Sequence, residues 1–350
     1  MRVLNLVTNA DSQFYRTQVS MLEARGVDST TLAVPGDHQY GVADEDTEGS
    51  ASRSLVDYVK FYPPVLRRSF EDYDLVHANY GLTAPAAIAQ PNLPVVLSLW
   101  GSDLMGTYGA VSKFCANHCD AVIVMSEEMA DELDRECHVI PHGVDLDRFE
   151  PMSRTAARDE MGWDPDAHHV LFPYPKGREV KNYARAERVV ERVRERVDRP
   201  VELQIASGIP HELMPTLFNA ADVLLLTSER EGSPNTVKEA MACNLPVVAT
   251  DVGDVRARLD GVANAHVATD DERLTDAVEA VLRRGERSDG RDAIRPLSTE
   301  RMAERIHGVY EEVLGRAVPG PGRNDGGGDD GGGGDGGGGD ESRSERIVEN

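Results

Sequence analysis

Short apolar runs alternate with amphipathic stretches along the first part of the chain. Arg2–Thr8 is an apolar run that predicts a buried β-strand, and Phe14–Arg25 repeats apolar residues at the spacing of a helix. The stretch 55–70 predicts a helix that Pro63-Pro64 interrupts, after a polar loop at 37–50. Further strands are predicted at 29–34, 75–78, 95–99 and 121–125. Strands that alternate with helices are typical of parallel βαβ units.

The same pattern restarts after a loop near residues 145–152. Strands are predicted at 169–173, 201–206, 223–227 and 246–250. Helices are predicted at 183–197, 210–219, 233–242, 271–284 and 299–314. We therefore expect an α/β protein with two doubly wound domains. The cleft between them is the expected ligand site, because parallel sheets bind ligands at the carboxyl ends of their strands.

The domain boundaries are placed at shifts in this pattern. Residues 1–150 are expected to form the first domain, 151–297 the second, and 298–316 a C-terminal helix. From 317 to 350 the chain is rich in Gly and Asp, and such a segment buries too little apolar surface to fold. We expect a disordered, solvated acidic tail there; a binding module is the alternative.

The charge of the chain limits its partners. Asp and Glu number 61 against 37 Lys and Arg in 350 residues, and the formal net charge of −24 argues against nucleic acid as a partner. Lysine occurs at only five positions: 60, 113, 176, 181 and 238. Abundant carboxylates with scarce lysine suit a cytosol rich in salt, where charges are screened over about 3 Å at ~1 M ionic strength. The alternative is an acidic protein without adaptation to salt. The first residues predict a strand and not a signal peptide, and no apolar run is long enough to span a membrane, so we expect a cytoplasmic protein.

The four cysteines are too few for a disulfide framework in a chain of this length. A zinc site could in principle use Cys115, His118, Cys119, Cys137 and His138, but their spacing matches no standard zinc signature. Cys115 and Cys119 are one helical turn apart, which is ordinary for two half-buried thiols. We therefore expect structural thiols and no metal site.

Residues 228–254, SEREGSPNTVKEAMACNLPVVATDVGD, contain the most informative motif. Ser233 as N-cap and Pro234 as first helical residue predict a helix start, whose free N–H groups suit a phosphate. Glu231 and Glu239 would repel a phosphate unless they accept hydrogen bonds from hydroxyl groups on either side of it. A nucleotide sugar has this layout. The alternative is a capped surface helix with two solvated glutamates.

This motif resembles that of the family 4 retaining glycosyltransferases of the GT-B fold. Their hallmark is two glutamates separated by seven residues, as Glu231 and Glu239 are. The similarity extends to Gly232, Ser233, Asn235, the segment 238–242, the strand at 245–248 and Thr250. The resemblance implies two Rossmann-like domains that face each other across a cleft, with the C-terminal helix packing back toward the first domain.

The same resemblance implies roles for single residues. Glu231 would contact the donor sugar and Glu239 the ribose. The donor diphosphate would bind the backbone of Ser233, Pro234, Asn235 and Thr236.

A second cluster, FPYPKGREVKNYARAERVV at 172–190, begins at the end of the predicted strand 169–173. Cations placed there suit a leaving diphosphate. The cluster resembles the family segment in which an Arg and a Lys hold the donor diphosphate, and Arg178 and Lys181 are the matching pair. The alternative is a solvated, charged helix start.

Three resemblances concern single residues outside these motifs. His211 resembles a residue near the nucleotide base, and a helix cap is an equal alternative. His77 resembles an acceptor-side histidine, with a core histidine as the alternative. Asp103 resembles an acceptor-cleft aspartate in a segment where Trp100 replaces the usual His.

The function implied is transfer of a sugar from a UDP- or GDP-sugar to an acceptor hydroxyl, with retained configuration and without a cofactor or metal. Arg178, Lys181 and the helix start would stabilise the leaving diphosphate, and Glu231 would orient the sugar. The alternatives are a soluble sugar-phosphate synthase, a nucleotide-sugar epimerase and a non-catalytic nucleotide-sugar binder. The chain has no P-loop, GxGxxG or GxSxG motif that would favour another class of enzyme.

The acceptor is expected to be a sugar or a lipid-linked glycan, in the assembly of polysaccharide, glycolipid or glycan. Residues 58–68, YVKFYPPVLRR, are basic and aromatic within a very acidic chain. By analogy with relatives that use lipid-linked acceptors, this segment is a candidate for peripheral contact with the inner face of a membrane. The alternative is a helix with core aromatics.

Overall fold

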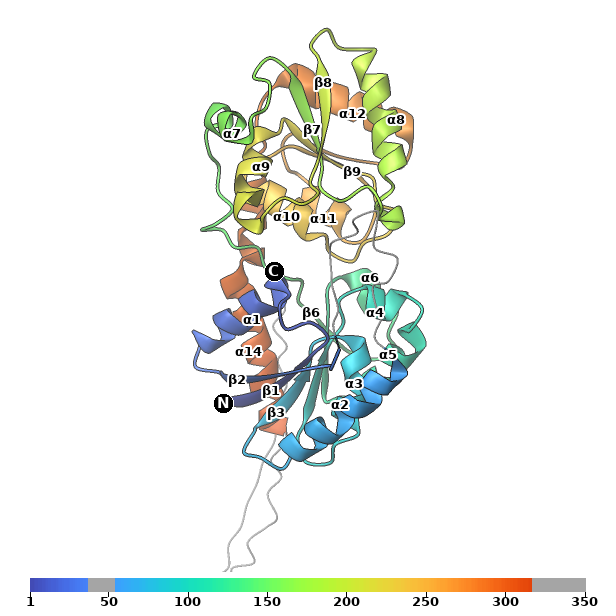
Figure 1. The fold of residues 1–350 in the computed structure, drawn as a ribbon, viewed down its shortest axis with the longest axis vertical. Helices are drawn as coiled ribbons and strands as arrows, with labels where there is room; N and C mark the ends of the chain where they lie inside the picture. The colour runs from blue at the N-terminus through green and yellow to red at the C-terminus, as the bar shows by residue number, and fades with distance from the viewer. Residues whose placement is uncertain (37–53, 317–350) are drawn as a thin grey trace, which may run out of the picture. The chain divides into compact units, whose positions relative to one another are not determined.

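The computed structural model describes residues 1–36 and 54–316. The predicted loop at 37–50 and the acidic tail from 317 onward lie outside the described residues. Strands and helices alternate along the described part, and the strands form two parallel sheets (Figure 1). The fold is α/β with two Rossmann-like domains, which confirms the fold class predicted from the sequence.

The first sheet has six strands in the order β2-β1-β3-β4-β5-β6. They are β1 (Arg2–Val7), β2 (Asp28–Ala33), β3 (Leu75–Ala78), β4 (Val95–Ser98), β5 (Ala121–Val124) and β6 (His138–Val139). The helices of this domain are α1 (Gln13–Glu23), α2 (Leu55–Arg68), α3 (Ala84–Ile88), α4 (Ser102–Met105), α5 (Gly109–Ala116) and α6 (Glu127–Asp131), with a short 3₁₀ turn at Gly81–Thr83. The strand order reverses between β1 and β3. At such a reversal the carboxyl ends of the strands form a crevice in which α/β sheets bind ligands.

The second sheet has five strands in the order β11-β10-β9-β7-β8. They are β7 (His168–Phe172), β8 (Val201–Ile205), β9 (Val223–Leu226), β10 (Val247–Thr250) and β11 (Ala265–Ala268). The helices are α7 (Arg154–Met161), α8 (Tyr183–Arg194), α9 (Met214–Ala220), α10 (Asn235–Ala242), α11 (Val255–Leu259), α12 (Asp271–Arg284) and α13 (Gly290–Ile294), with 3₁₀ turns at Glu179–Lys181, His211–Leu213 and Arg295–Leu297. Here the strand order reverses between β7 and β9.

The last described helix, α14 (Thr299–Arg316), returns to the first domain. It packs against α1, and its Tyr310 hydroxyl lies 2.6 Å from Nδ1 of His77 at the core of the first sheet. Just before α14, Ser298 forms an isolated parallel β-bridge with Val144. A C-terminal helix that packs on the first domain is what the sequence predicted.

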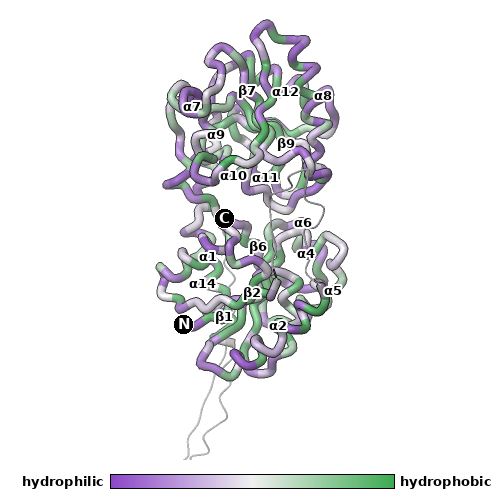
Figure 2. Tube along the Cα trace, in the orientation of Figure 1, coloured by the Kyte–Doolittle hydropathy of each residue, from purple (hydrophilic) through white to green (hydrophobic). Residues whose placement is uncertain are grey.

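Apolar side chains from the strands form the two cores. β3 and β9 are buried along their whole length, and Figure 2 shows apolar residues along the tube at β7 and β9. Strands in parallel sheets are covered by helices on both faces, so they read as continuous apolar runs in the sequence. This is why the pattern predicted the inner strands.

The structure corrects two local predictions. Pro63 and Pro64 lie inside α2 and do not interrupt it. Their missing N–H groups leave the carbonyls of Val59 and Lys60 without helical partners, but both residues are exposed, so water can bond these carbonyls. Helix α10 begins at Asn235 with Pro234 as its N-cap, one residue later than predicted. Two short strands, β6 and β11, were not predicted.

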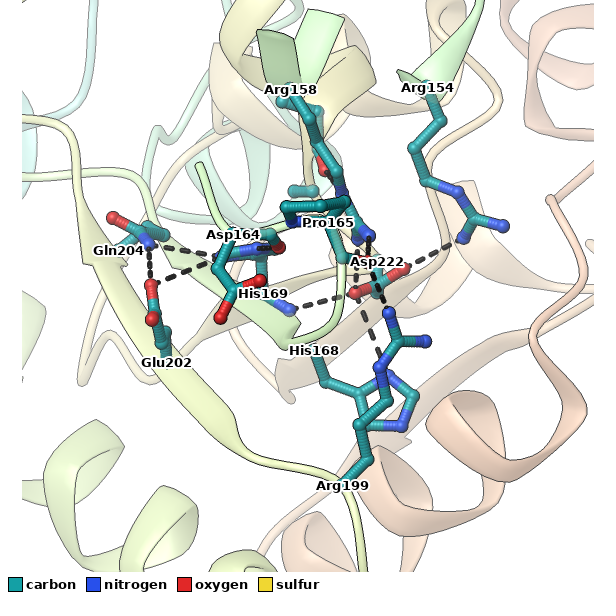
Figure 3. A network of polar contacts seen from close by, with 12 residues as sticks. Arg154, Arg158, Asp164, Pro165, His168, His169, Arg199, Glu202, Gln204 and Asp222 are labelled. Atoms are coloured by element: carbon teal, nitrogen blue, oxygen red, sulfur yellow. Dashed lines mark hydrogen bonds and ion pairs between the residues drawn. The ribbon is translucent and has the colours of Figure 1, made fainter. Parts of the chain in front are cut away.

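Asp222 joins the amino ends of β7 and β9 through a network of polar contacts (Figure 3). Its carboxylate accepts hydrogen bonds of 2.7 Å from Nη1 of Arg154, Nη2 of Arg158 and the backbone N–H of His169. The side chains of Asp222 and Arg158 are only 9% and 7% exposed. The network lies at the edge of the sheet opposite the carboxyl ends of the strands. It therefore stabilises the second domain away from the expected ligand site.

In residues 1–36 and 54–316, no helix combines the length and the apolar composition needed to cross a membrane.

Candidate donor site

The candidate site lies where the strand order of the second sheet reverses. Tyr174 comes just after β7, and the segment from Ser228 to Glu231 comes just after β9. β7 and β9 are neighbours, so these two segments meet at one edge of the sheet. This is the position at which open α/β sheets bind their ligands.

Several hydrogen bonds at this edge converge on Glu231. One of its carboxylate oxygens, Oε1, accepts hydrogen bonds from Lys181 Nζ at 2.5 Å, from Ser228 Oγ at 2.7 Å and from the Tyr174 hydroxyl at 3.2 Å. The side chains of Lys181 and Glu231 are 7% and 10% exposed. A charged pair this close to complete burial is retained only where its hydrogen bonds offset the loss of water.

Two cations lie against the ring of Tyr174. Lys181 Nζ is 4.1 Å from the ring centroid, and the guanidinium carbon of Arg178 is 5.6 Å from it. Lys181 is buried, whereas Arg178 is exposed. The structure thus brings together Arg178, Lys181 and Glu231, which the sequence motifs had singled out from two separate segments.

Burial controls the protonation of this cluster. It lowers the pKa of Lys181, while the Glu231 carboxylate acts in the opposite direction. It also raises the pKa of the Tyr174 hydroxyl, and Glu231 adds to that rise. Tyr174 is therefore a neutral hydrogen-bond donor to Glu231, and its oxygen also lies 3.0 Å from Thr236 Oγ1.

The start of α10 presents polar groups that are not paired within the described residues. Pro234 at the N-cap has no side-chain oxygen that could bond the N–H groups of the first turn. Ser233 Oγ and Asn235 Oδ1 are buried and have no hydrogen-bond partner there. The prediction that Ser233 caps the helix was therefore wrong. Helix starts with free N–H groups bind anions, and buried polar atoms without partners are costly unless a ligand or water meets them.

Glu239, on the second turn of α10, lines a narrow cavity together with Arg148, His142 and His211. Nδ1 of His211 is buried and has no partner among the described residues. The cavity measures about 40 Å³, far less than the roughly 300–1,000 Å³ of typical small-molecule pockets.

Two titratable neighbours on α10 have shifted pKa values. Burial raises the pKa of Glu239 to about 7, although Lys238 and Arg148 act against this. Burial lowers the pKa of Lys238 to about 8. Lys238 Nζ donates a 2.6 Å hydrogen bond to the carbonyl of His142, so this lysine ties the helix to the segment that follows β6.

The two acceptor-side candidates are buried in the first domain. Nδ1 of His77 lies 2.6 Å from the Tyr310 hydroxyl, and Nε2 lies 2.8 Å from Ser98 Oγ. Burial lowers the pKa of His77 to about 3, so the ring is neutral. This geometry favours the alternative of a core histidine. Asp103 accepts hydrogen bonds from the backbone N–H groups of Gly81, Trp100 and Gly101, so its carboxylate holds the loops after β3 and β4 in place.

Sequence reasoning missed Tyr174, Ser228 and Arg148. The first two follow β7 and β9 closely, and this position was the signal that could have identified them. No comparable sequence signal marks Arg148. The folding of the chain brings this residue to the cavity.

The thiols proposed as a zinc alternative do not form a cluster. Cys115 and Cys119 are both buried on or next to α5, and Cys119 Sγ donates to the carbonyl of Cys115. Within the part of the chain that the structure describes, no three His, Cys, Asp or Glu side chains come together in a way that could hold a metal ion.

Comparison with family models finds one match in each domain. Residues 14–148 match the model described as Glycosyltransferase Family 4, and residues 178–284 match the model described as Glycosyl transferases group 1. Each domain thus matches a glycosyltransferase family. The second match covers Arg178, Lys181, Glu231 and Glu239.

The chain is also similar to curated glycosyltransferases. The D-inositol 3-phosphate glycosyltransferase of Geodermatophilus obscurus is 32% identical over 230 residues, which cover 53% of this chain and 51% of that protein. The lipopolysaccharide core biosynthesis mannosyltransferase LpsB of Rhizobium meliloti is 28% identical over 240 residues, which cover 58% of this chain and 68% of that protein. The chain spans about half the length of several curated relatives that it matches, between 51% and 57%.

Solved structures define the fold. The sucrose-phosphate synthase of Thermosynechococcus elongatus superposes with a TM-score of 0.71 at 16% identity, covering 91% of this chain and 100% of that chain. HepE of Anabaena, solved in complex with UDP, superposes with a TM-score of 0.66 at 14% identity, covering 89% and 100%. The fold is GT-B.

Proposed function

We propose that the chain is a glycosyltransferase that moves a sugar from a nucleotide diphosphate donor to an acceptor hydroxyl. One observation supports this most directly: the Lys181–Glu231 pair lies at the β7/β9 reversal. The start of α10, with its unpaired polar groups, lies four residues after Glu231 in the chain. The pair offers a cation for a diphosphate and a carboxylate for sugar hydroxyl groups.

In this proposal Arg178, Lys181 and the start of α10 hold the donor diphosphate. Positive charge fixed at that position stabilises the negative charge that develops as the sugar leaves. The proposal contains no metal ion, because these groups supply the charge. Glu231 orients the donor sugar. The departing phosphate takes the proton of the acceptor hydroxyl on the same face, so the configuration at the anomeric carbon is retained.

The nucleotide is proposed to extend toward Glu239 and His211. Glu239 would accept hydrogen bonds from the ribose hydroxyls, and the unpaired Nδ1 of His211 lies on the same cavity wall for the base. UDP- and GDP-sugars are the proposed donors. UDP is bound in the solved HepE structure of the same fold.

The acceptor is proposed to be a sugar or a lipid-linked glycan in the assembly of polysaccharide, glycolipid or glycan. The proposed place of action is the cytoplasm, at the inner face of the membrane. α2 supports this, because it carries Lys60, Arg67 and Arg68 in a chain whose net charge is −24. Basic residues beside exposed apolar ones are typical of helices that lie on anionic membranes.

The test is a transfer assay with UDP- and GDP-sugars and with simple glycosides or lipid extracts as acceptors. We expect release of nucleoside diphosphate that depends on the acceptor, and a product whose anomeric configuration, measured by NMR, matches that of the donor. Donor conversion that needs no acceptor would contradict the proposal and would favour an epimerase.

Donor affinity is expected to depend on pH through Glu239. The ionised carboxylate accepts hydrogen bonds from both ribose hydroxyls, so affinity should rise between about pH 6 and about pH 8, around its pKa of about 7. The unliganded fold responds in the opposite sense. A carboxyl whose pKa is raised by folding stabilises the fold most at low pH and loses that contribution as the pH rises through about 7.

Calorimetric titration of the UDP- or GDP-sugar at the two pH values measures this effect, because the phosphates of a nucleotide sugar are diesters that do not titrate in this range. Glu239→Gln cannot ionise and serves as the matched control, so its affinity should not change over that range. An equal pH dependence in Glu239→Gln and in the wild type would assign the titration to another group, such as Lys238.

We also propose that the protein is adapted to concentrated salt. Repulsion among 61 carboxylates is screened over about 10 Å at ~0.1 M salt and about 3 Å at ~1 M. The melting temperature is expected to rise over that range of KCl. A melting temperature that stays constant or falls would contradict the proposal.

A further inference from the structure

A second cavity lies in the first domain, away from the donor site. It has a volume of about 650 Å³, within the range of pockets that hold small organic ligands. Its walls are mostly aliphatic and aromatic: they include Val59, Phe61, Tyr62, Leu82, Ala86 and Val111. These residues come from α2, from α5, and from the segment that leads through α3, and α3 packs against both α2 and α5. The proposed donor chemistry makes no use of this cavity.

The cavity reaches the ligand-binding edge of the first sheet. Thr8 and Tyr80 are part of its lining, and they come directly after β1 and shortly after β3. The strand order of the first sheet reverses between these two strands. The cavity therefore occupies the first domain's equivalent of the position that the donor site occupies in the second.

A line of aromatic rings connects this cavity with the donor cavity. Tyr80 packs edge-on against Trp100, with ring centroids 6.3 Å apart, and Trp100 packs edge-on against His142 at 4.8 Å. His142 lines the same cavity as Glu239. Three aromatic rings, those of Tyr80, Trp100 and His142, thus lie between the apolar cavity and the cavity that Glu239 lines.

The rim of the cavity is apolar, and α2, which forms part of it, also carries basic residues. Leu55 and Val59 on α2 and Tyr108 before α5 line it and are 83%, 70% and 54% exposed. Exposed apolar residues clustered around one opening mark a surface that meets lipid or another apolar partner. Lys60, Arg67 and Arg68 lie on α2 itself, so the charge of this helix is opposite to that of the whole chain and complementary to an anionic lipid.

We propose that this cavity holds the hydrocarbon chain of a lipid-linked acceptor. The chain enters between α2 and α5, and the polar end of the lipid emerges near Tyr80, on the side of the donor site. A hydrocarbon occupant fits because most of the lining is aliphatic or aromatic carbon surface. The inference rests on the proposed function, since it assigns the acceptor of that reaction.

The experiment uses dodecyl maltoside with bromine atoms in its chain, below its critical micelle concentration. Bromine quenches nearby tryptophan fluorescence, and the chain has only two tryptophans, Trp100 and Trp163. In a Trp163→Phe background, Trp100 reports on the cavity. We expect saturable quenching by the brominated detergent and none by the unbrominated one.

Two variants fill the cavity. Ala86→Phe adds a ring from a buried position of its wall, and Ala89→Phe adds one from the exposed end of α3, where the risk to folding is smaller. Either is expected to weaken binding of the brominated chain by about tenfold or more. Each methylene group of the detergent that the added ring excludes from the cavity stays exposed to water. Val56→Phe is the matched control. Val56 is exposed on α2, so this change adds the same ring to the surface and should leave binding unchanged.

The role as acceptor site is tested by transfer to methyl and dodecyl forms of one glycoside. The dodecyl chain should lower KM in the wild type and in Val56→Phe, but not in the two filled variants. No quenching, or quenching that the filled variants retain, would overturn the cavity assignment while transfer to the methyl glycoside persists. Intact quenching without transfer to either glycoside would refute the proposed function, and with it the acceptor role.

Discussion

Lys181→Ala is expected to slow sugar transfer by about 10²–10³-fold, the usual effect of removing one fixed group that stabilises developing charge. Lys181 is the buried cation of the pair at the β7/β9 reversal, 2.5 Å from Glu231. Its loss removes positive charge from the leaving diphosphate and leaves the Glu231 carboxylate without its cation. The decrease should appear in kcat, because negative charge on the diphosphate increases as the sugar leaves.

Lys176→Ala is the matched control for this change. Lys176 belongs to the same segment, but its ammonium is exposed and lies 4.7 Å from the ring centroid of Tyr183, not at Glu231. We expect little change in rate for Lys176→Ala and a partial loss for Lys181→Arg, which keeps the charge with another shape. A folded Lys181→Ala protein with the wild-type kcat would contradict the proposed role of this lysine.

Asp222→Ala is expected to reduce the free energy of unfolding of the second domain by about 3–5 kcal/mol. The change leaves the guanidinium groups of Arg154 and Arg158 without their carboxylate, and Arg158 is almost completely buried. It also removes the acceptor for the N–H of His169. At about 2–4 °C per kcal/mol, the melting temperature measured by circular dichroism should fall by roughly 6–20 °C.

Asp276→Ala provides the comparison. Asp276 pairs with Arg196 at 2.7 Å, but its side chain is 62% exposed, and such pairs contribute about 0–1 kcal/mol. Asp222 lies at the edge of the sheet opposite the proposed donor site, so the folded fraction of Asp222→Ala should bind donor like the wild type. Equal melting temperatures for the two variants would show that the network in Figure 3 does not stabilise the domain as described.

The burial of strands on both faces of the sheets explains how much of the fold the sequence could predict. Strands such as β3 and β9 are buried along their length, so their apolar runs are unambiguous. β6 has only two residues, and β11 contains His266 at a half-buried position, so neither produces such a run. Pro63 and Pro64 misled the prediction for α2, because their effect depends on which face of the helix meets water.

The candidate site was predictable to the extent that its groups are close in sequence or follow strand ends. The seven-residue spacing identified Glu231 and Glu239, and the second motif supplied Arg178 and Lys181. The sequence could not show that Lys181 bonds Glu231, 50 positions away. His77 shows the same limit, since its hydroxyl partner Tyr310 lies 233 residues further along the chain. Such partners become visible only when the sheets and α14 are assembled.

The central claim is that the edge of the second sheet from Lys181 to Glu239 binds a nucleotide sugar. The most direct measurement is thermal unfolding in concentrated KCl with UDP-, GDP-, ADP- and dTDP-sugars, for the wild type and for Glu239→Ala. A donor present at about 100 times its dissociation constant should stabilise the fold by about 2.7 kcal/mol. We expect one nucleotide class to raise the melting temperature of the wild type and to leave that of Glu239→Ala unchanged. Equal shifts in both proteins, or no shift with any donor in a well-folded wild type, would contradict the claim.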